Sequence, residues 1–298
     1  MRAWLACSLL LLPLGGQADL HVSIVQGLSG APEYGAAFDA QVAIVKRSAE
    51  ALTGPERVTT FIGEQASRDQ VLAHLESLGD LSSADRAALF LIGHGSFDGF
   101  EYKFNLPGPD LTGEDLVVAL DAVPAGVQLL VNTSSASGAL LDSLKNDQRI
   151  VITATRTGGE RHATRFGEYF FGALTSAQAD INKNGAISAQ EAFDYAERQV
   201  ADWFEFEGRL ATEHPKLVGE RAAQFTLARL RPQAADNDNP ELAILRKQRD
   251  DIDSQIEALQ LRRDTLSTSE YFTRLERLML DLALVQEQID TLDGVDED

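Results

Sequence analysis

Two short segments decide the fold of this chain: AALFLIGHG at residues 87–95 and VQLLVNTSSASG at residues 127–138. Each begins with a run rich in aliphatic residues, without alternation of apolar and polar positions, which is typical of a strand buried on both faces of a parallel sheet. Each run then ends abruptly in small polar residues. Because ligands of open parallel sheets bind at the carboxyl ends of the strands, we expect His94 and the serines after Val131 to share one edge of the sheet, which we call the carboxyl edge.

Strands and helices alternate on both sides of these segments. The patterns predict strands at residues 20–25, 58–62, 87–92, 127–131 and 149–154, and helices at residues 33–52, 67–78, 113–120 and 137–144. Ser67 and Thr112 are predicted N-caps. Residues 98–105 are expected to form a short exposed ribbon, and residues 220–230 to be helical. This alternation predicts one α/β domain built on a mainly parallel, right-handed wound sheet.

A strand that ends in His-Gly, followed by a strand that ends in a nucleophile position and then x-Ser-Gly, resembles the caspase-like clan of cysteine peptidases, and within it the bacterial type of the legumain-like (C13) family. Three further segments carry the same resemblance: LPGPDL at 106–111, VITATR at 151–156 and ATEHP at 211–215. The resemblance covers about residues 19–220. It implies a caspase-like three-layer domain over residues 19–230, in which His94 is the general base and Ser135 stands at the position of the nucleophilic cysteine.

Ser135 is the point at which the chain departs from that family. The only cysteine is Cys7, which lies in a predicted leader, so the mature chain would contain no thiol. A serine hydroxyl needs a well-placed base and usually a third group that orients the base. Two interpretations therefore stay open: Ser135 fills the space of the cysteine in an inactive relative, or Ser135 and His94 form a hydrolase dyad with the backbone N–H groups of Gly95 and Ser135 as the oxyanion hole.

The resemblance also implies that the segment at residues 155–162 shapes substrate binding. Arg156 and Glu160 are the candidate substrate-binding residues there, since a buried Arg156 would recognise an acidic group. The alternative is a solvated loop with scattered charges.

A second motif, DINKNGAISAQE at residues 180–191, matches the twelve-residue EF-hand loop. Its candidate Ca²⁺ ligands are the side chains of Asp180, Asn182, Asn184 and Glu191 and the backbone carbonyl of Ala186. Helices predicted at residues 165–174 and 189–204 supply the flanks that the motif requires. With only two carboxylates, the affinity should be modest, which suits a site outside the cytoplasm. The alternative is a polar turn in which Ser188 and Glu191 act only as a capping box.

Residues 1–18 have the pattern of a cleavable signal peptide, with Arg2 before an apolar run at residues 4–14 that is shorter than the about twenty residues of a membrane span. We therefore expect a periplasmic or secreted protein without a membrane span. The formal net charge of -20 argues against nucleic-acid partners and anionic membranes, both of which need basic patches.

The C-terminal part changes pattern. Residues 231–240 are polar and bounded by prolines, as expected for a linker. Residues 241–293 then carry apolar positions in heptad spacing, interrupted near Ser267, and residues 294–298 form an acidic tail. Two such helices predict a hairpin or coiled coil, either closed on itself or paired with another chain.

Three functional classes follow from these features. The first is a catalytically inactive C13-like pseudopeptidase that binds calcium and acts as a recognition or assembly module for a protein or peptide partner. The second is an active hydrolase that uses Ser135 and His94. The third is a structural protein that forms a homo-oligomer through residues 241–293.

Overall fold

The computed structural model describes residues 19–230, 240–261, 263 and 266–293. The predicted signal peptide, residues 231–239 of the predicted linker and the acidic tail lie outside the described residues. In the described part of the chain, no helix is both long and apolar enough to cross a membrane.

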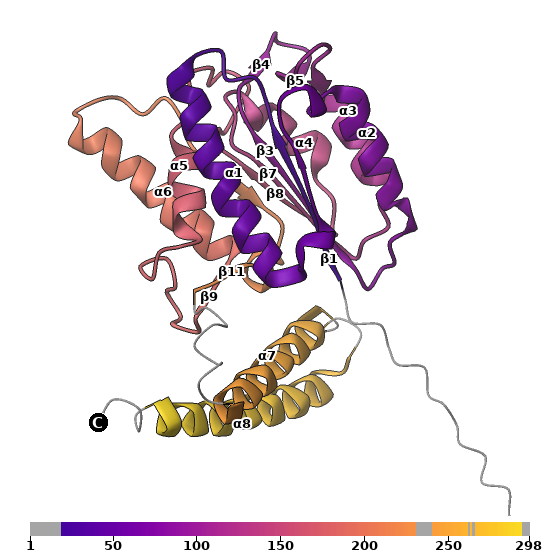
Figure 1. Cartoon of the computed structure of the whole chain (residues 1–298), viewed down its shortest axis with the longest axis vertical. Coiled ribbons are helices and arrows are strands. Elements are labelled where there is room, and N and C mark those ends of the chain that lie inside the picture. Colours follow the sequence, from indigo (N-terminus) through magenta and orange to yellow (C-terminus); the bar gives the residue numbers. More distant parts are fainter. Residues whose placement is uncertain (1–18, 231–239, 262, 264–265, 294–298) are drawn as a thin grey trace, which may run out of the picture.

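A six-stranded sheet forms the centre of the domain, in the order β10-β8-β7-β3-β1-β2 (Figure 1). Its strands are β1 (Leu20–Gln26), β2 (Val58–Phe61), β3 (Arg86–Ile92), β7 (Val127–Asn132), β8 (Arg149–Thr153) and β10 (Lys216–Val218). All pairings between the first five are parallel, and β10 lies antiparallel to β8 at one edge. The five predicted strands are therefore present, while β10 was not predicted, because three residues show no periodic pattern.

Helices cover both faces of this sheet and give three layers (Figure 1). One face is covered by α1 (Pro32–Thr53), α5 (Phe166–Ala173) and α6 (Ala189–Phe206), and the other by α2 (Arg68–Ser77), α3 (Gly113–Asp121) and α4 (Leu141–Leu144). Short 3-10 helices complete this part: η1 (Pro55–Arg57), η2 (Gly63–Gln65), η3 (Leu78–Asp80), η4 (Ser137–Leu140) and η5 (Ala222–Gln224). The predicted α/β architecture is confirmed.

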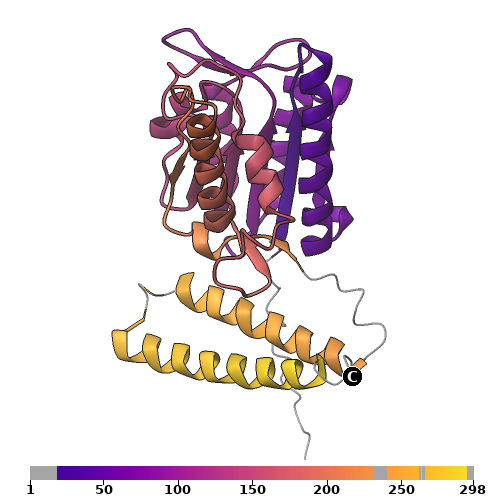
Figure 2. The same ribbon diagram turned by 90° about the vertical axis from the view of Figure 1, so that its left-hand side faces the viewer.

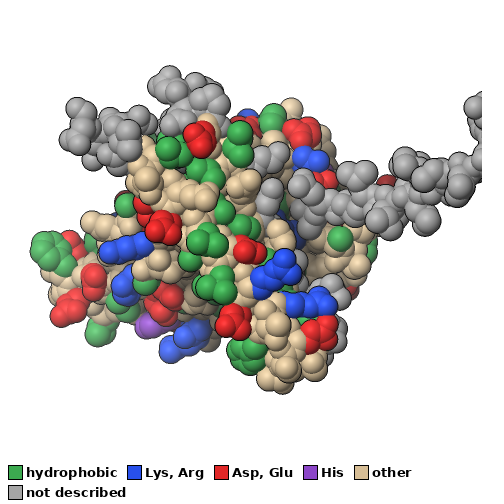
Figure 3. Space-filling model, turned by 90° about the horizontal axis from the view of Figure 1, so that it is seen from below, with side chains coloured by type: hydrophobic (Ala, Val, Ile, Leu, Met, Phe, Trp, Pro, Cys, Tyr) green, Lys and Arg blue, Asp and Glu red, His purple; other side chains and the backbone are tan. Residues whose placement is uncertain are grey.

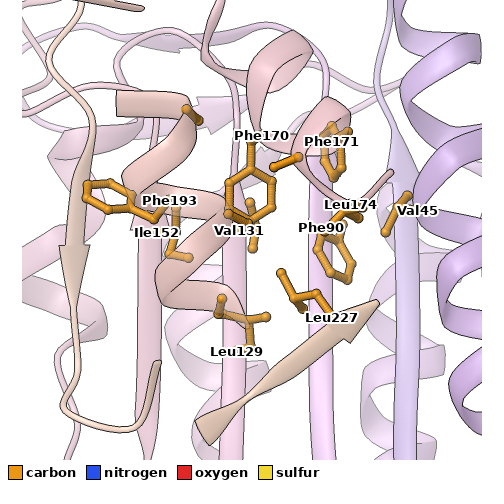
Figure 4. Packing of buried hydrophobic residues seen from close by; sticks show 14 of the residues in the cluster. Val45, Phe90, Leu129, Val131, Ile152, Phe170, Phe171, Leu174, Phe193 and Leu227 are labelled. Carbon is orange, nitrogen blue, oxygen red and sulfur yellow. The ribbon is translucent and has the colours of Figure 1, made fainter. Parts of the chain in front are cut away.

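The two hydrophobic cores explain why the central strands lack alternation. Along β3, Phe90 and Ile92 belong to the core under α1, α5 and α6, whereas Leu89 and Leu91 belong to the core under α2, α3 and α4. Figure 4 shows Phe90, Val131 and Ile152 of three neighbouring strands facing aromatic rings of α5 and α6. Successive side chains of a strand point to opposite faces, so both must be apolar when both faces are covered.

The two predicted N-caps behave differently. Thr112 forms the expected cap of α3: its hydroxyl accepts from the backbone N–H of Asp115 (3.1 Å), and the Asp115 carboxylate accepts from the N–H of Thr112 (3.0 Å). Asp115 also accepts two hydrogen bonds from the Arg68 guanidinium (2.6 and 2.7 Å), which ties α3 to α2. Ser67 is the N-cap residue of α2 as predicted, but its side chain makes no capping hydrogen bond, and only its backbone carbonyl accepts from the first turn, from the N–H of Val71.

The expected exposed ribbon is also corrected. β4 (Gly95–Phe97), β5 (Tyr102–Phe104) and β6 (Leu111–Thr112) form a three-stranded antiparallel sheet beside the carboxyl edge. Tyr102 and Phe104 are 3% and 0% exposed, whereas Phe100 in the turn is 97% exposed. The aromatic side chains of β5 are therefore part of the core below α3. The alternation of aromatic and polar residues reflects a strand with one buried face.

Residues 220–230 do not form the predicted helix beyond a single 3-10 turn. They form η5 and then β11 (Thr226–Arg229), which pairs antiparallel with β9 (Ala186–Ser188). Phe225, Leu227 and Ala228 lie in the core under α1 and α6. These residues form a strand because they pair with β9, a segment about forty residues away. The local sequence pattern does not contain that pairing.

The C-terminal part forms the predicted helical hairpin, made of α7 (Pro240–Leu261) and α8 (Thr268–Asp293) (Figure 2). Leu242 and Leu245 near the start of α7 pack with Ile289 near the end of α8, so the helices are antiparallel. The seam positions predicted in α8 are all buried or half-buried: Tyr271, Leu275, Leu278, Leu282, Val285, Ile289 and Leu292. The two helices thus cover the predicted seam within one chain.

The N-terminus of α5 is capped by a side chain from a distant segment. The carboxylate of Glu213, a residue that is 3% exposed, accepts from the backbone N–H groups of Arg165 (2.8 Å) and Phe166 (3.2 Å). Burial raises the pKa of Glu213 to about 6, against the opposing effect of these hydrogen bonds and of the Arg165 guanidinium. The neighbouring carboxylate of Glu160 acts in the same direction as burial.

We expect Glu213→Gln to remove a pH-dependent loss of stability. A carboxyl whose pKa is raised by folding binds its proton more tightly in the folded state, so the wild type loses stability as the pH rises from about 4.5 to about 6. The unfolding free energy of the variant, relative to wild type, should therefore increase by about 2 kcal/mol between about pH 4 and about pH 7. Urea denaturation of both proteins measures this difference. A difference in unfolding free energy between the two proteins that stays constant with pH would contradict a raised pKa of Glu213 in the folded state.

Candidate functional site

Parallel pairing of β3 with β7 brings His94 and Ser135 to the same edge of the sheet. The two strands are in register up to Leu91 and Asn132, and the N–H of Thr133 donates to the carbonyl of Leu91 (3.1 Å). His94 and Ser135 each follow their strand by two or three residues. The structure therefore places both candidate residues at the carboxyl edge.

The hydroxyl of Ser135 is engaged with the backbone. Its Oγ donates to the carbonyl oxygen of Gly95 (2.8 Å), and the residue is 6% exposed. A serine nucleophile must instead direct its proton toward a base. The predicted nucleophile therefore bonds to the carbonyl of Gly95, the residue whose backbone N–H is one of the two predicted oxyanion donors.

The imidazole of His94 makes different contacts. Its Nε2 lies 3.1 Å from the carbonyl oxygen of Ser29, and because a carbonyl only accepts, Nε2 carries the proton. The ring also contacts Tyr34 and Phe38 of α1 edge-on, with centroid distances of 4.7 and 5.3 Å. Among the described residues, no hydrogen bond joins His94 to Ser135. The structure brings the two residues to one edge but does not assemble them as a dyad.

A buried network lies beneath the edge and contains a second serine. Ser134 Oγ lies 2.6 Å from the hydroxyl of Tyr102 and 2.8 Å from Oδ1 of Asn132, and Asn132 Nδ2 donates to the Tyr102 hydroxyl (2.8 Å). Burial raises the pKa of Tyr102 to about 12, so the phenol stays protonated. These three side chains satisfy one another and connect β5 with β7, which makes Ser134 a structural residue. Sequence reasoning did not single out this network, because nothing local links residue 102 to residue 132.

Glu160, a candidate substrate-binding residue, holds the edge together. Its carboxylate accepts from the N–H of Arg156 (2.8 Å) and from both the N–H (3.1 Å) and Nδ1 (2.7 Å) of His214. Its carbonyl accepts from the N–H of Ala136, directly after Ser135 (2.8 Å). Glu160 therefore joins three segments, and His214 is a member of this edge that sequence reasoning did not assign. The ATEHP segment was the available signal.

Arg156 is not the buried arginine that would recognise an enclosed acidic group. Its side chain is 58% exposed and lies 3.9 Å from the Glu160 carboxylate. It begins a basic segment, residues 156–165, whose cations are Arg156, Arg161, Arg165 and, when protonated, His162, with Glu160 as its one acidic residue. Arg161 and His162 are exposed. In a chain of net charge -20, this segment is a local concentration of positive charge beside Ser135.

The loop at residues 180–191 joins α5 to α6, as the predicted motif requires. Asp180 accepts from the N–H groups of Asn184 (3.1 Å) and Gly185 (2.9 Å), and Asn184 Oδ1 accepts from the N–H of Ala186 (2.8 Å). Gly185 has a φ of 78°, which an L side chain rarely adopts. These bonds curl the loop so that the candidate ligands at its first, third and fifth positions lie on one short turn.

Glu191 closes the loop from its far end. One carboxylate oxygen lies 3.2 Å from the N–H of Ile181 and 3.4 Å from the N–H of Asn182, while the other accepts from the N–H and hydroxyl of Ser188. The capping box of the alternative interpretation is therefore present. In the described part of the chain, no group of three or more His, Cys, Asp or Glu side chains is arranged to hold a metal. The loop offers two carboxylates, with amide and backbone oxygens as its other donors.

The same loop is connected to the end of the domain. The N–H of Leu230, the last described residue before α7, donates to the carbonyl of Gly185 (2.8 Å), and β9 within the loop pairs with β11. The loop is therefore hydrogen-bonded to the residue at which the chain leaves the α/β domain.

Neither a protein-family model nor a curated protein matches this chain. Among solved structures, the chain is similar to the crystal structure of caspase-1 from Spodoptera frugiperda. The two are 11% identical, the similarity covers 72% of this chain and 91% of that chain, and the TM-score is 0.46. This likeness concerns the path of the backbone alone, and no residue role is taken from it.

Proposed function

We propose that the chain is an exported, non-catalytic relative of the legumain-like peptidases that acts as a calcium-binding recognition and assembly module. The observation that carries the proposal is that the two candidate catalytic side chains bond to different backbone carbonyls. Ser135 donates to Gly95, and His94 donates to Ser29, so each proton is already committed to a backbone carbonyl. Export rests on the sequence of residues 1–18 alone.

The carboxyl edge supports recognition better than catalysis. Its supporting side chains are hydrogen-bonded to one another, through the buried Tyr102 network and through the bonds of half-buried Glu160. Arg156, Arg161 and His162 of the basic segment are exposed beside them. A rigid base with accessible cations suits a protein or peptide that presents carboxylates, and the charge contrast with the rest of the chain would direct its approach.

Calcium is the proposed ligand of the loop at residues 180–191. The side-chain oxygens of Asp180, Asn182, Asn184 and Glu191 and the backbone carbonyl of Ala186 are hard donors of the kind Ca²⁺ prefers. The carboxylates of Asp180 and Glu191 would supply the negative charge of the site, and the amide and backbone oxygens its neutral donors. Because Leu230 is bonded to the loop, calcium would also stiffen the attachment of the hairpin, the proposed assembly element.

The purified protein should not cleave asparaginyl or aspartyl peptides, and a fluorophosphonate probe should not label Ser135. The reason is that the hydroxyl proton points to a carbonyl, which cannot remove it. Peptide hydrolysis assays and mass spectrometry of the labelled protein check this, with a known serine hydrolase as the positive control. Turnover that disappears in both Ser135→Ala and His94→Ala would favour the hydrolase and sink the proposal.

Calcium should raise the melting temperature of the wild type. Binding to the folded state alone contributes about 2.7 kcal/mol when free calcium exceeds Kd a hundredfold. Glu191→Gln should lose most of that gain, because Gln keeps the capping box with Ser188 but lacks the charge. Glu197→Gln, an exposed position on the same helix, is the matched control and should respond like wild type. Equal melting temperatures with calcium and with chelator would leave the loop as a polar turn.

A further inference from the structure

The loop at residues 180–191 contains a dipeptide, Asn184-Gly185, whose chemistry has not entered the account so far. Asn184 is the only asparagine of the chain that glycine follows. The side-chain amide of asparagine is chemically labile, because the next backbone nitrogen can attack Cγ and close a five-membered ring. Glycine leaves that nitrogen unhindered. Asn184 is exposed, and a Cβ atom at position 185 would meet no other atom within 4 Å, so the dipeptide has room to react.

The hydrogen bonds of the loop engage both reacting groups. The N–H of Gly185 donates to Oδ2 of Asp180 (2.9 Å), so a carboxylate lies where the proton must go when this nitrogen acts as a nucleophile. Oδ1 of Asn184 accepts from the N–H of Ala186 (2.8 Å), so a donor is in place for the negative charge that develops on this oxygen during the attack. One short turn thus holds the nitrogen, the proton acceptor and the oxyanion donor together.

We propose that Asn184 and Gly185 form a self-deamidation site. The Gly185 nitrogen bonds to Cγ of Asn184, the Cγ–Nδ2 bond breaks, and ammonia leaves with the former amide proton of Gly185, which gives a succinimide. Water then opens the ring. Addition at Cγ gives aspartate at position 184, and addition at the main-chain carbonyl carbon gives isoaspartate. Water is the only other reactant.

Either product adds a carboxyl group to the loop. Aspartate at position 184 would be a third carboxylate beside Asp180 and Glu191. Isoaspartate would lengthen the main chain at the turn where Gly185 has a φ of 78°. The loop lies at the end of the α/β domain nearest the hairpin (Figure 1). On the visible surface of that end, acidic and basic side chains are interspersed (Figure 3), so the added charge would act mainly on its own loop.

Asn182 supplies an internal control within the same loop. It is also exposed, and its Oδ1 likewise accepts from the backbone N–H two residues further on, that of Asn184 (3.0 Å). The next residue, however, is Lys183, which carries a side chain beside the nitrogen. Among the described residues, the N–H of Lys183 donates to no carboxylate. We therefore expect Asn182 to stay intact while Asn184 reacts.

Peptide mapping by mass spectrometry, on full-length protein incubated at neutral pH with chelator, tests the proposal. Asn184 should deamidate and Asn182 should not. Conversion should be at least as fast in the folded protein as in the same protein unfolded in guanidinium chloride, where the bonds of the loop are lost. Asp180→Asn should slow the reaction at position 184 about tenfold, because the proton acceptor loses its charge. Glu197→Gln, an exposed position on α6, is the matched control and should react like wild type.

An Asn184 that stays intact in the folded protein while the unfolded chain deamidates would overturn the proposal, and so would an Asp180→Asn variant that reacts at the wild-type rate. A repeat of the incubation with calcium separates this inference from the proposed function, on which only the calcium effect rests. An ion held by Asp180 and Asn184 would occupy both groups and slow the reaction. Deamidation that calcium does not slow supports the reaction and counts against calcium in the loop. An intact Asn184 with and without calcium overturns the deamidation, and the melting temperatures then decide calcium binding separately.

Discussion

The close approach of Gly95 to the segment after β7 is the contact on which the carboxyl edge depends. A Cβ atom at position 95 would lie 2.5 Å from Ser134 Oγ and 2.7 Å from the carbonyl oxygen of Ser135. Without a side chain there, β4 can start directly against that segment, and Tyr102 of β5 can reach Ser134. The same closeness lets the Gly95 carbonyl take the Ser135 hydroxyl. The contact that orders the edge thus also engages the Ser135 hydroxyl with a backbone carbonyl.

Other side chains at the edge also bond to backbone groups. Glu160 joins its own loop to His214 and to Ala136, and Glu213 caps α5. The exposed side chains beside this edge include Arg156, Arg161 and His162 of the basic segment at residues 156–165. At the opposite end of α5, the loop that resembles an EF-hand is bonded to the point where the chain leaves the domain. The proposed recognition segment and the proposed assembly element would therefore be connected through α5.

The sequence was a good guide wherever one physical signal dominated. Buried aliphatic runs located the five parallel strands, and parallel pairing then required His94 and Ser135 to share an edge. The sequence could not supply the direction of the Ser135 hydroxyl, because that depends on the carbonyl of Gly95, which follows the neighbouring strand. The pairing of β11 with β9 is equally non-local. In the hairpin, heptad spacing identified the seam, because its apolar positions recur on one face of each helix.

The state of the His94 imidazole tests the central claim most directly. The Ser29 carbonyl requires that Nε2 carries the proton of the neutral ring. Long-range proton–nitrogen NMR spectra identify the protonated nitrogen. We predict the Nε2–H form in the wild type and an unchanged His94 spectrum in Ser135→Ala, because the two side chains bond to different carbonyls. An Nδ1–H form, or a His94 spectrum that changes when the Ser135 hydroxyl is removed, would show that the two residues form a dyad after all.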